Sequence, residues 1–214
     1  MPLIGRRRLL AALAGAIAIA AGIRGATWRP APDLITSECE GNTAMTDRIL
    51  VAYATRTGST AEVADAIARH LCAAGLAAEA RPVGEVTTLE GVSGAVLGSA
   101  VRYAAWLPEM TDFIVANRDA LSEMPVAFFT MHMLALGEDA AALAERAKYT
   151  AKARGLIPPR DEVFFEGMID PARLSFFDRL AVRLVKSPVG DRRDWERIAG
   201  WADRIAPQLA SVQA

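Results

Sequence analysis

The chain has 214 residues, which is enough for one domain with a sizeable core and an additional segment. Its 24 Lys and Arg residues are balanced by 25 Asp and Glu residues, and a net charge of −1 excludes the basic surface typical of nucleic-acid-binding proteins. The two cysteines, Cys39 and Cys72, lack metal-ligand spacing, and the two histidines, His70 and His132, lie far apart. We therefore expect neither a metal site nor a disulfide framework.

Residues 1–44 differ in composition from the rest of the chain. Arg6-Arg7-Arg8 precede an uncharged, Ala-rich run from Leu9 to Ile23, and a polar, Pro-bearing stretch follows. This pattern resembles an export signal of the twin-arginine type. As a helix the run would span about 22 Å, which is short of a hydrocarbon core of about 30 Å, so it could anchor the chain only with help from its flanks. The other interpretation is a mis-assigned start, with the domain beginning at Met45.

A strand-like run over Ile49–Ala54 is followed directly by a turn rich in hydroxyl groups. The turn consists of Thr55, Arg56, Thr57, Gly58, Ser59 and Thr60. A helix is expected over Ser59–Ala74, since Val63, Ile67 and Leu71 share one face. Strand, turn and helix together present backbone amides and a helix dipole to a phosphate. Neither Gly-Lys-Ser/Thr nor G-x-G-x-x-G is present. The alternative is a plain helix start, with Ser59 and Glu62 forming a capping box.

From there on strand-like and helix-like segments alternate. We expect further strands over Ala78–Val83, Val92–Ser99, Val126–Met131 and Glu162–Ile169. The first of these is weak and is expected at an edge, because Glu79 and Arg81 are charged. We expect helices over Pro108–Arg118, Asp139–Arg154 and Arg192–Leu209. The alternation predicts an α/β domain over residues 45–210, with three layers and a doubly wound parallel five-stranded sheet in the order 2-1-3-4-5.

In such a sheet the loops after the first, third and fourth strands meet at the switch point, where ligands bind. The second of these loops, Ser99–Trp106, carries Tyr103, Trp106 and an arginine, and the third, Met131–Leu136, is almost wholly apolar. A phosphate site at one end and apolar, aromatic walls at the other suit riboflavin phosphate (FMN). The alternatives are that Tyr103 and Trp106 are ordinary packing aromatics and that His132 has no role.

The turn Thr55–Thr60 resembles the phosphate loop of the flavodoxins. Other stretches resemble one branch of that superfamily, the quinone-linked protoporphyrinogen dehydrogenases: Gly98–Tyr103, Met124–Phe129, Phe176–Leu180 and Asp194-Trp195-Glu196. The resemblance runs from about Ile49 to Ile205. The chain departs from this branch at Lys186–Arg193, a short link where the branch has a longer insertion, and in its export-like leader.

The resemblance implies a flavodoxin-like fold and an FMN-dependent oxidoreductase that passes electrons from protoporphyrinogen IX through the flavin to a quinone. The phosphate would be held by Thr55, Arg56, Thr57, Gly58, Ser59 and Thr60. The ring would lie against Ser99, Ala100, Val101 and Arg102, stacked on Tyr103, with Met131, His132, Met133 and Leu134 closing the other side. No catalytic base is identified, and Arg102 is a candidate for binding substrate carboxylates or anionic reduced flavin. The alternatives are a non-catalytic flavodoxin-type carrier that docks on redox proteins and a fold that has lost its flavin.

An extra helix is expected within residues 173–186. Phe177, Leu180, Ala181, Leu184 and Val185 fall on one face, opposite Arg179, Arg183 and Lys186. This composition is typical of a helix lying in a membrane interface, and the alternative is a face that packs on the sheet or covers an edge. We therefore expect a cytoplasmic protein, peripheral on the inner membrane. The second possibility is export or anchoring through the leader.

Overall fold

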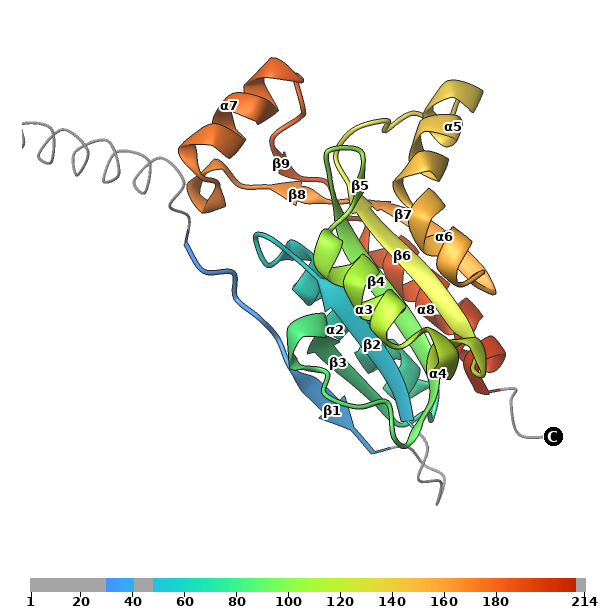
Figure 1. The fold of residues 1–214 in the computed structure, drawn as a ribbon. Helices are drawn as coiled ribbons and strands as arrows, with labels where there is room; N and C mark the ends of the chain where they lie inside the picture. Colours follow the sequence, from blue (N-terminus) through green and yellow to red (C-terminus); the bar gives the residue numbers. More distant parts are fainter. Residues whose placement is uncertain (1–29, 41–47, 211–214) are drawn as a thin grey trace, which may run out of the picture.

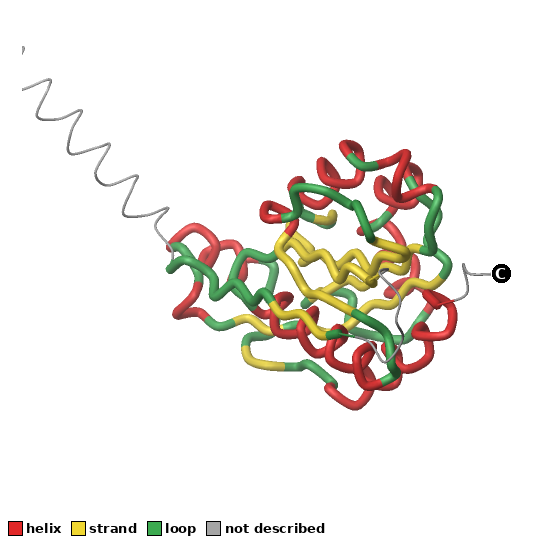
Figure 2. The backbone as a smooth tube through the Cα atoms, turned by 90° about the horizontal axis from the view of Figure 1, so that it is seen from below, coloured by secondary structure: helices red, strands yellow, loops and turns green. Residues whose placement is uncertain are grey.

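The computed structural model describes residues 30–40 and 48–210, which form a sheet covered by helices on both faces (Figures 1 and 2). The strands of the main sheet are β1 (Ser37–Cys39), β2 (Arg48–Ala54), β3 (Ala78–Pro82), β4 (Val92–Arg102), β5 (Ala105–Trp106), β6 (Val126–His132) and β7 (Asp161–Glu166). A separate ribbon pairs β8 (Met168–Ile169) with β9 (Gly190–Asp191).

Helices cover both faces of the sheet. They are α2 (Ser59–Ala73), α3 (Pro108–Ala116), α4 (Arg118–Ser122), α5 (Ala140–Tyr149), α6 (Ala151–Leu156), α7 (Phe176–Leu184) and α8 (Trp195–Ala210), with short 3-10 turns η1 (Val83–Glu85) and η2 (Pro171–Arg173). Helix α7 lies outside the two helix layers. Side chains of β2 alternate between the layers: Val51 and Tyr53 pack with α2 and α8, whereas Leu50 and Ala52 pack on the side of α3. Each helix layer therefore has its own apolar core against one sheet face.

The predicted sheet is confirmed. Strands β3, β2, β4, β6 and β7 lie side by side and are all parallel, which is the order 2-1-3-4-5. The central strands β4 and β6 are apolar and buried on both faces, as parallel strands between two helix layers must be. Gly98 of β4 is needed because a Cβ there would lie 1.9 Å from the Phe129 ring.

The expectation that Ala78–Val83 forms the edge of the sheet is wrong. Strand β1 pairs antiparallel with β3, so the sheet extends into residues that the composition groups with the leader. The charges on β3 are accommodated by pairing, since Glu79 lies 3.0 Å from Arg48 and 2.8 Å from Arg81. The described domain therefore includes Ser37–Cys39, upstream of Met45. The predicted signal or anchor run lies within residues 1–29 and the alternative start at Met45 within residues 41–47, both outside the described part of the chain.

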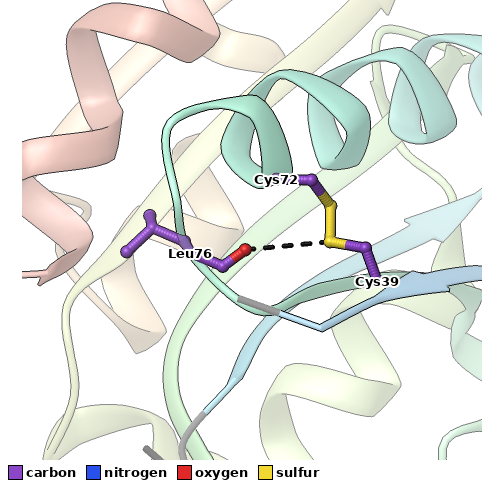
Figure 3. The surroundings of a disulfide bond; sticks show 3 residues. All are labelled: Cys39, Cys72 and Leu76. Atoms are coloured by element: carbon purple, nitrogen blue, oxygen red, sulfur yellow. Dashed lines mark hydrogen bonds between the residues drawn. A yellow bond between two sulfur atoms is a disulfide. The ribbon is translucent and has the colours of Figure 1, made fainter. Parts of the chain in front are cut away.

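The expectation of no disulfide is also wrong. Cys39 at the end of β1 is bonded to Cys72 near the end of α2, and the Sγ of Cys39 lies 3.7 Å from the Leu76 carbonyl oxygen (Figure 3). The two cysteines are 33 residues apart, so only the pairing of β1 with β3 reveals that they meet. The disulfide links β1 covalently to α2.

Several predicted elements are divided or shortened in the structure. The helix expected over Asp139–Arg154 is two helices, and Asp139 caps the first by accepting the amides of Ala141 and Ala142. The strand expected over Glu162–Ile169 divides into β7 and β8. The last helix begins at Trp195, and the extra helix α7 is shorter than its expected range. None of the described helices is long and apolar enough to span a bilayer.

We predict that the disulfide contributes about 3–4 kcal/mol to stability, from loop-closure entropy for a separation of 33 residues. Urea unfolding of the oxidised full chain should therefore show a higher unfolding free energy than the Cys39→Ser/Cys72→Ser double variant. Adding a reductant should lower the stability of the wild type and leave the variant unchanged. Equal stabilities of the oxidised wild type and the variant would contradict this account.

Candidate functional site

A cavity of about 600 Å³ lies at the carboxyl ends of the parallel strands. In Figure 1 the β4–β5 hairpin rises between α7 and α5 at this end of the sheet. Eleven of the predicted site residues line the cavity: Arg56, Thr57, Ser59, Ala100, Val101, Arg102, Tyr103, Met131, His132, Met133 and Leu134. The other four predicted residues, Thr55, Gly58, Thr60 and Ser99, are not part of the lining. The three predicted loops therefore meet around one space.

The turn between β2 and α2 is built around Gly58. Gly58 has φ +92° and is the N-cap residue of α2, and its amide donates to the Thr55 hydroxyl oxygen at 3.1 Å. No side chain caps the helix. The alternative capping box does not form, because Ser59 already lies inside the helix and Glu62 pairs with Arg193 at 2.7 Å. The amides of Ala61 and Glu62 donate to the Gly58 carbonyl oxygen at 2.9 and 3.3 Å, which leaves the amides of Ser59 and Thr60 for another acceptor.

The first turn of α2 fits a phosphate group. Thr60 is fully buried, and its Oγ1 has no hydrogen-bond partner in the described part of the chain. A buried hydroxyl without a partner is costly, and an anion at the helix N-terminus would satisfy it together with the free amides. A Cβ at Gly58 would lie only 3.3 Å from the Asp33 carbonyl oxygen and 3.4 Å from Nη1 of Arg173, so a larger residue would crowd this end of the helix.

The second loop is a tight β-hairpin. Tyr103 and Ala104 form its turn with φ of 53° and 57°, values that bulky residues adopt at a cost of roughly 1–3 kcal/mol each. The Tyr103 side chain is 84% exposed and borders the cavity, with the Arg102 guanidinium 4.9 Å from its ring centre. Trp106 instead is a packing residue, since its buried Nε1 donates to the Thr130 hydroxyl at 2.8 Å.

The third loop places a neutral imidazole beside the cavity. His132 is buried and its Nδ1 lies 2.8 Å from the Leu134 carbonyl oxygen, which can only accept, so Nδ1 carries the proton. Nε2 has no partner among the described residues. Burial lowers the pKa of His132, and the nearby guanidinium of Arg146 lowers it further, against the hydrogen bond to Leu134. Nε2 is therefore available as a hydrogen-bond acceptor.

A fourth wall comes from residues 167–194, here called the β7–α8 segment. Within it Phe177, Ala181 and Val182 of α7 and the following Val185 border the cavity. The helix is fastened by Asp178, which lies 2.7 Å from Arg102 and accepts from the Ser175 hydroxyl. Arg102 is therefore not a free cation, and one of its guanidinium nitrogens is already bonded to Asp178.

The apolar face expected on α7 is divided in the structure. No residue of α7 is buried, which excludes the alternative in which this face packs on the sheet. One row of side chains borders the cavity, although its members Phe177 and Val185 are still 51% and 55% exposed, and a second row of Phe176, Leu180 and Leu184 is exposed outside the cavity. Cavity residues that the sequence analysis missed include Met168, Ile169, Leu174 and Tyr149. The first three could have been expected from the extra helix after the last strand. That strand ends at the same sheet edge as the three predicted loops, so the chain that follows it must pass beside the cavity.

The chain is similar to known proteins along most of its length. A family model described as a flavodoxin domain matches residues 50–195. Protoporphyrinogen IX dehydrogenase (quinone) of Escherichia coli strain K12 is 26% identical over 177 residues, covering 74% of this chain and 94% of that protein. A point mutant of the flavodoxin from Pseudomonas aeruginosa superposes with a TM-score of 0.51 at 15% identity, covering 77% of this chain and 99% of that chain. The Flv1 flavodiiron core from Synechocystis sp. PCC6803 gives 0.52 at 15% identity, covering 79% and 38%.

We predict that Thr60→Val changes stability and FMN affinity in opposite directions. Removing an unpaired buried hydroxyl should leave the apoprotein as stable as the wild type or more stable by up to about 1 kcal/mol. The lost hydrogen bond to a charged phosphate should weaken FMN binding about tenfold or more. The control is Thr111→Val, which removes a hydroxyl that donates to the Pro108 carbonyl and should lower stability only. Unchanged FMN affinity in Thr60→Val would contradict the phosphate assignment.

We predict that acidification below about pH 6.5 destabilises the fold through His132. Its folded pKa lies below the ordinary value of 6.5, so the unfolded chain binds the proton first and stability falls as the pH drops through this window. Urea unfolding at pH 7.5 and at about pH 5.5 should show a smaller difference for His132→Gln than for the wild type. An identical difference in both proteins would contradict a lowered pKa of His132 in the folded chain.

Proposed function

The chain belongs to the flavodoxin family and binds FMN, and from this premise we propose that it is an FMN-dependent oxidoreductase that dehydrogenates protoporphyrinogen IX and passes the electrons to a quinone. Bound FMN would supply the redox chemistry by taking electrons from the substrate and releasing them to the acceptor. The substrate and acceptor follow the name of the Escherichia coli relative and the branch motifs.

The observation that carries this proposal is the ion pair between Arg102 and Asp178, 2.7 Å long. It joins the Arg-Tyr stretch of the hairpin to the Phe-Asp-Arg stretch of α7, two of the motifs that resemble the dehydrogenase branch. The pair holds an apolar helix beside the flavin loops, where Phe177 and Val182 border the cavity. An apolar wall suits a large, flat substrate such as a porphyrinogen, whereas an electron carrier needs no such wall.

In this proposal the residues of the chain bind, orient and exclude water. The Gly58 turn and Thr60 would hold the phosphate, and the hairpin with Tyr103 would lie against the flavin ring. The neutral His132 would offer Nε2 as an acceptor at the third loop. The apolar side chains of α7 would exclude water from the substrate side of the cavity.

The charge around the cavity gives no support to the alternative of a non-catalytic carrier. Carriers that dock by charge present a rim of one sign to their partners. Here the cavity is bordered by Arg56 and Arg102 on one hand and by Glu145 and Asp178 on the other, so neither sign dominates.

We predict that the purified full chain oxidises protoporphyrinogen IX in the absence of oxygen when a quinone is present. Val182→Asp should lower kcat/KM for protoporphyrinogen about tenfold or more, because it places a charge on the apolar wall, while FMN stays bound. The matched control is Val115→Asp on α3, whose side chain is exposed outside the cavity and should keep the activity. Electron transfer to redox proteins without any protoporphyrinogen oxidation would favour the carrier.

We also propose that α7 docks on an anionic membrane surface. The exposed row of Phe176, Leu180 and Leu184 is apolar, and Arg179 and Arg183 share the helix. Basic residues beside exposed Phe and Leu are the composition of interfacial helices. A docked α7 would bring the cavity next to the bilayer, where quinones dissolve.

The full chain should co-sediment with liposomes of anionic lipid, and binding should weaken as the salt concentration rises. Leu180→Asn/Leu184→Asn should reduce the bound fraction severalfold while FMN is retained. The control is Val115→Asn, which replaces an exposed apolar residue on α3. Protein that stays in the supernatant at low salt would refute the docking proposal.

Of the two expected locations, the disulfide supports export. Disulfides persist in oxidising compartments and are rare in the cytosol, and the Cys39–Cys72 bond ties β1 to the domain. Alkylation of cysteines in intact cells, followed by reduction and a second alkylation, should find both cysteines protected in an exported protein. Complete alkylation in the first step would place the folded protein in the cytoplasm.

A further inference from the structure

Two arginines of the β7–α8 segment contact carbonyl oxygens of the turn Thr55–Thr60, here called the phosphate turn. Arg173, at the end of η2, donates through Nη1 to the Thr57 carbonyl oxygen at 3.0 Å. Arg193, two residues beyond β9, places Nη1 3.5 Å from the Ser59 carbonyl oxygen. The two residues lie twenty positions apart and reach the same turn from opposite ends of the segment that carries α7.

The contact of Arg173 orients the peptide group between Thr57 and Gly58. In a trans peptide the C=O and the following N–H point in opposite directions. The bond from Arg173 to the Thr57 carbonyl therefore sends the Gly58 amide the other way, where it donates to Thr55 at 3.1 Å. The Ser59–Thr60 peptide lies inside α2, so the helix itself points the Thr60 amide toward the N-terminus, where an anion binds, and Arg193 adds a contact of 3.5 Å to the Ser59 carbonyl oxygen.

The same arginines neutralise a carboxylate at the phosphate end of α2. Glu62 lies in the first turn of the helix, and its charge would repel a bound phosphate. Its two oxygens lie 2.7 Å from Nη1 of Arg193 and 3.6 Å from Nη1 of Arg173. The Arg193 side chain is only 5% exposed, and it is held in place by Asp191 at 2.7 Å and by the Trp195 ring.

We propose that Arg173 and Arg193 are positioning residues that couple the FMN phosphate to the β7–α8 segment. They orient the phosphate turn and cancel the charge of Glu62, and neither is assigned a contact with FMN itself. Because coupling between two sites is reciprocal, a bound phosphate also stabilises the attachment of the segment and hence the α7 wall of the cavity. The inference rests on FMN binding, and it holds for any substrate on the α7 side.

The test compares FMN with riboflavin, which has the same ring and no phosphate. Both flavins are titrated into the apo form of the full chain, and the ratio of the two Kd values reports the contribution of the phosphate. Arg173→Gln is the main variant, because its side chain is a third exposed and its loss leaves no deep cavity. We expect its FMN affinity to fall about tenfold and its riboflavin affinity to stay unchanged.

Three further variants separate positioning from a general structural effect. Arg173→Lys keeps the charge and a donor, and it should recover most of the FMN affinity. Glu62→Gln in the Arg173→Gln background should recover part of it by removing the repelling charge. Arg179→Gln is the matched control for the loss of a basic residue in this segment, because Arg179 bonds the Leu174 carbonyl instead of the turn. It should bind both flavins like the wild type.

Hydrogen exchange of the β7–α8 segment gives a readout of the coupling that is independent of activity. FMN should protect amides in residues 170–193 more than riboflavin does, and Arg173→Gln should remove this difference. A parallel loss of affinity for both flavins, or equal protection by both, would overturn the coupling while leaving the proposed oxidoreductase intact. Failure to bind FMN at all would overturn both.

Discussion

The candidate flavin site depends on hydrogen-bonding groups at the start of α2 that have no partner. Gly58 takes a left-handed conformation, no side chain caps the helix, and the buried Oγ1 of Thr60 has no partner among the described residues. Unpaired donors inside a protein are destabilising until an acceptor arrives, and a phosphate supplies several acceptor oxygens at once. The parallel sheet explains why the other loops are close by, since β2, β4 and β6 all end at the same edge.

The cavity combines two parts with different physical origins. The turn at Gly58 and the loops after β4 and β6 follow from the flavodoxin sheet, which fixes their positions through strand order. The α7 wall is an addition that has no buried residue of its own and is held by ion pairs such as Arg102–Asp178. The sheet therefore fixes where the three loops lie, whereas the wall is attached more weakly and also contacts the Thr55–Thr60 turn through Arg173 and Arg193.

Local pattern was sufficient to predict the order of the five parallel strands and to place the Thr55–Thr60 turn beside the cavity at the carboxyl edge of the sheet. Apolar runs such as Val126–Met131 are long enough to be strands buried on both faces. Hydroxyl side chains around Gly58, between a strand and a helix, indicate an anion-binding turn without any information from distant residues. Strand β1 has three residues and no alternating pattern, and its partner lies far along the chain, so its pairing and the disulfide of Cys39 were missed. Helical spacing alone also could not show which α7 side chains border the cavity and which lie outside it. That depends on how α7 sits against the neighbouring loops.

The central claim is that this chain encloses FMN through the phosphate turn, and the most direct test is the flavin that the full chain carries. The protein is purified, incubated with a mixture of FMN, FAD and riboflavin at micromolar concentrations, separated from free flavin and denatured, and the released flavins are quantified. The account predicts FMN in an amount equal to the chain, with riboflavin and FAD nearly absent. A protein that retains no flavin, or that retains riboflavin as well as FMN, would contradict it.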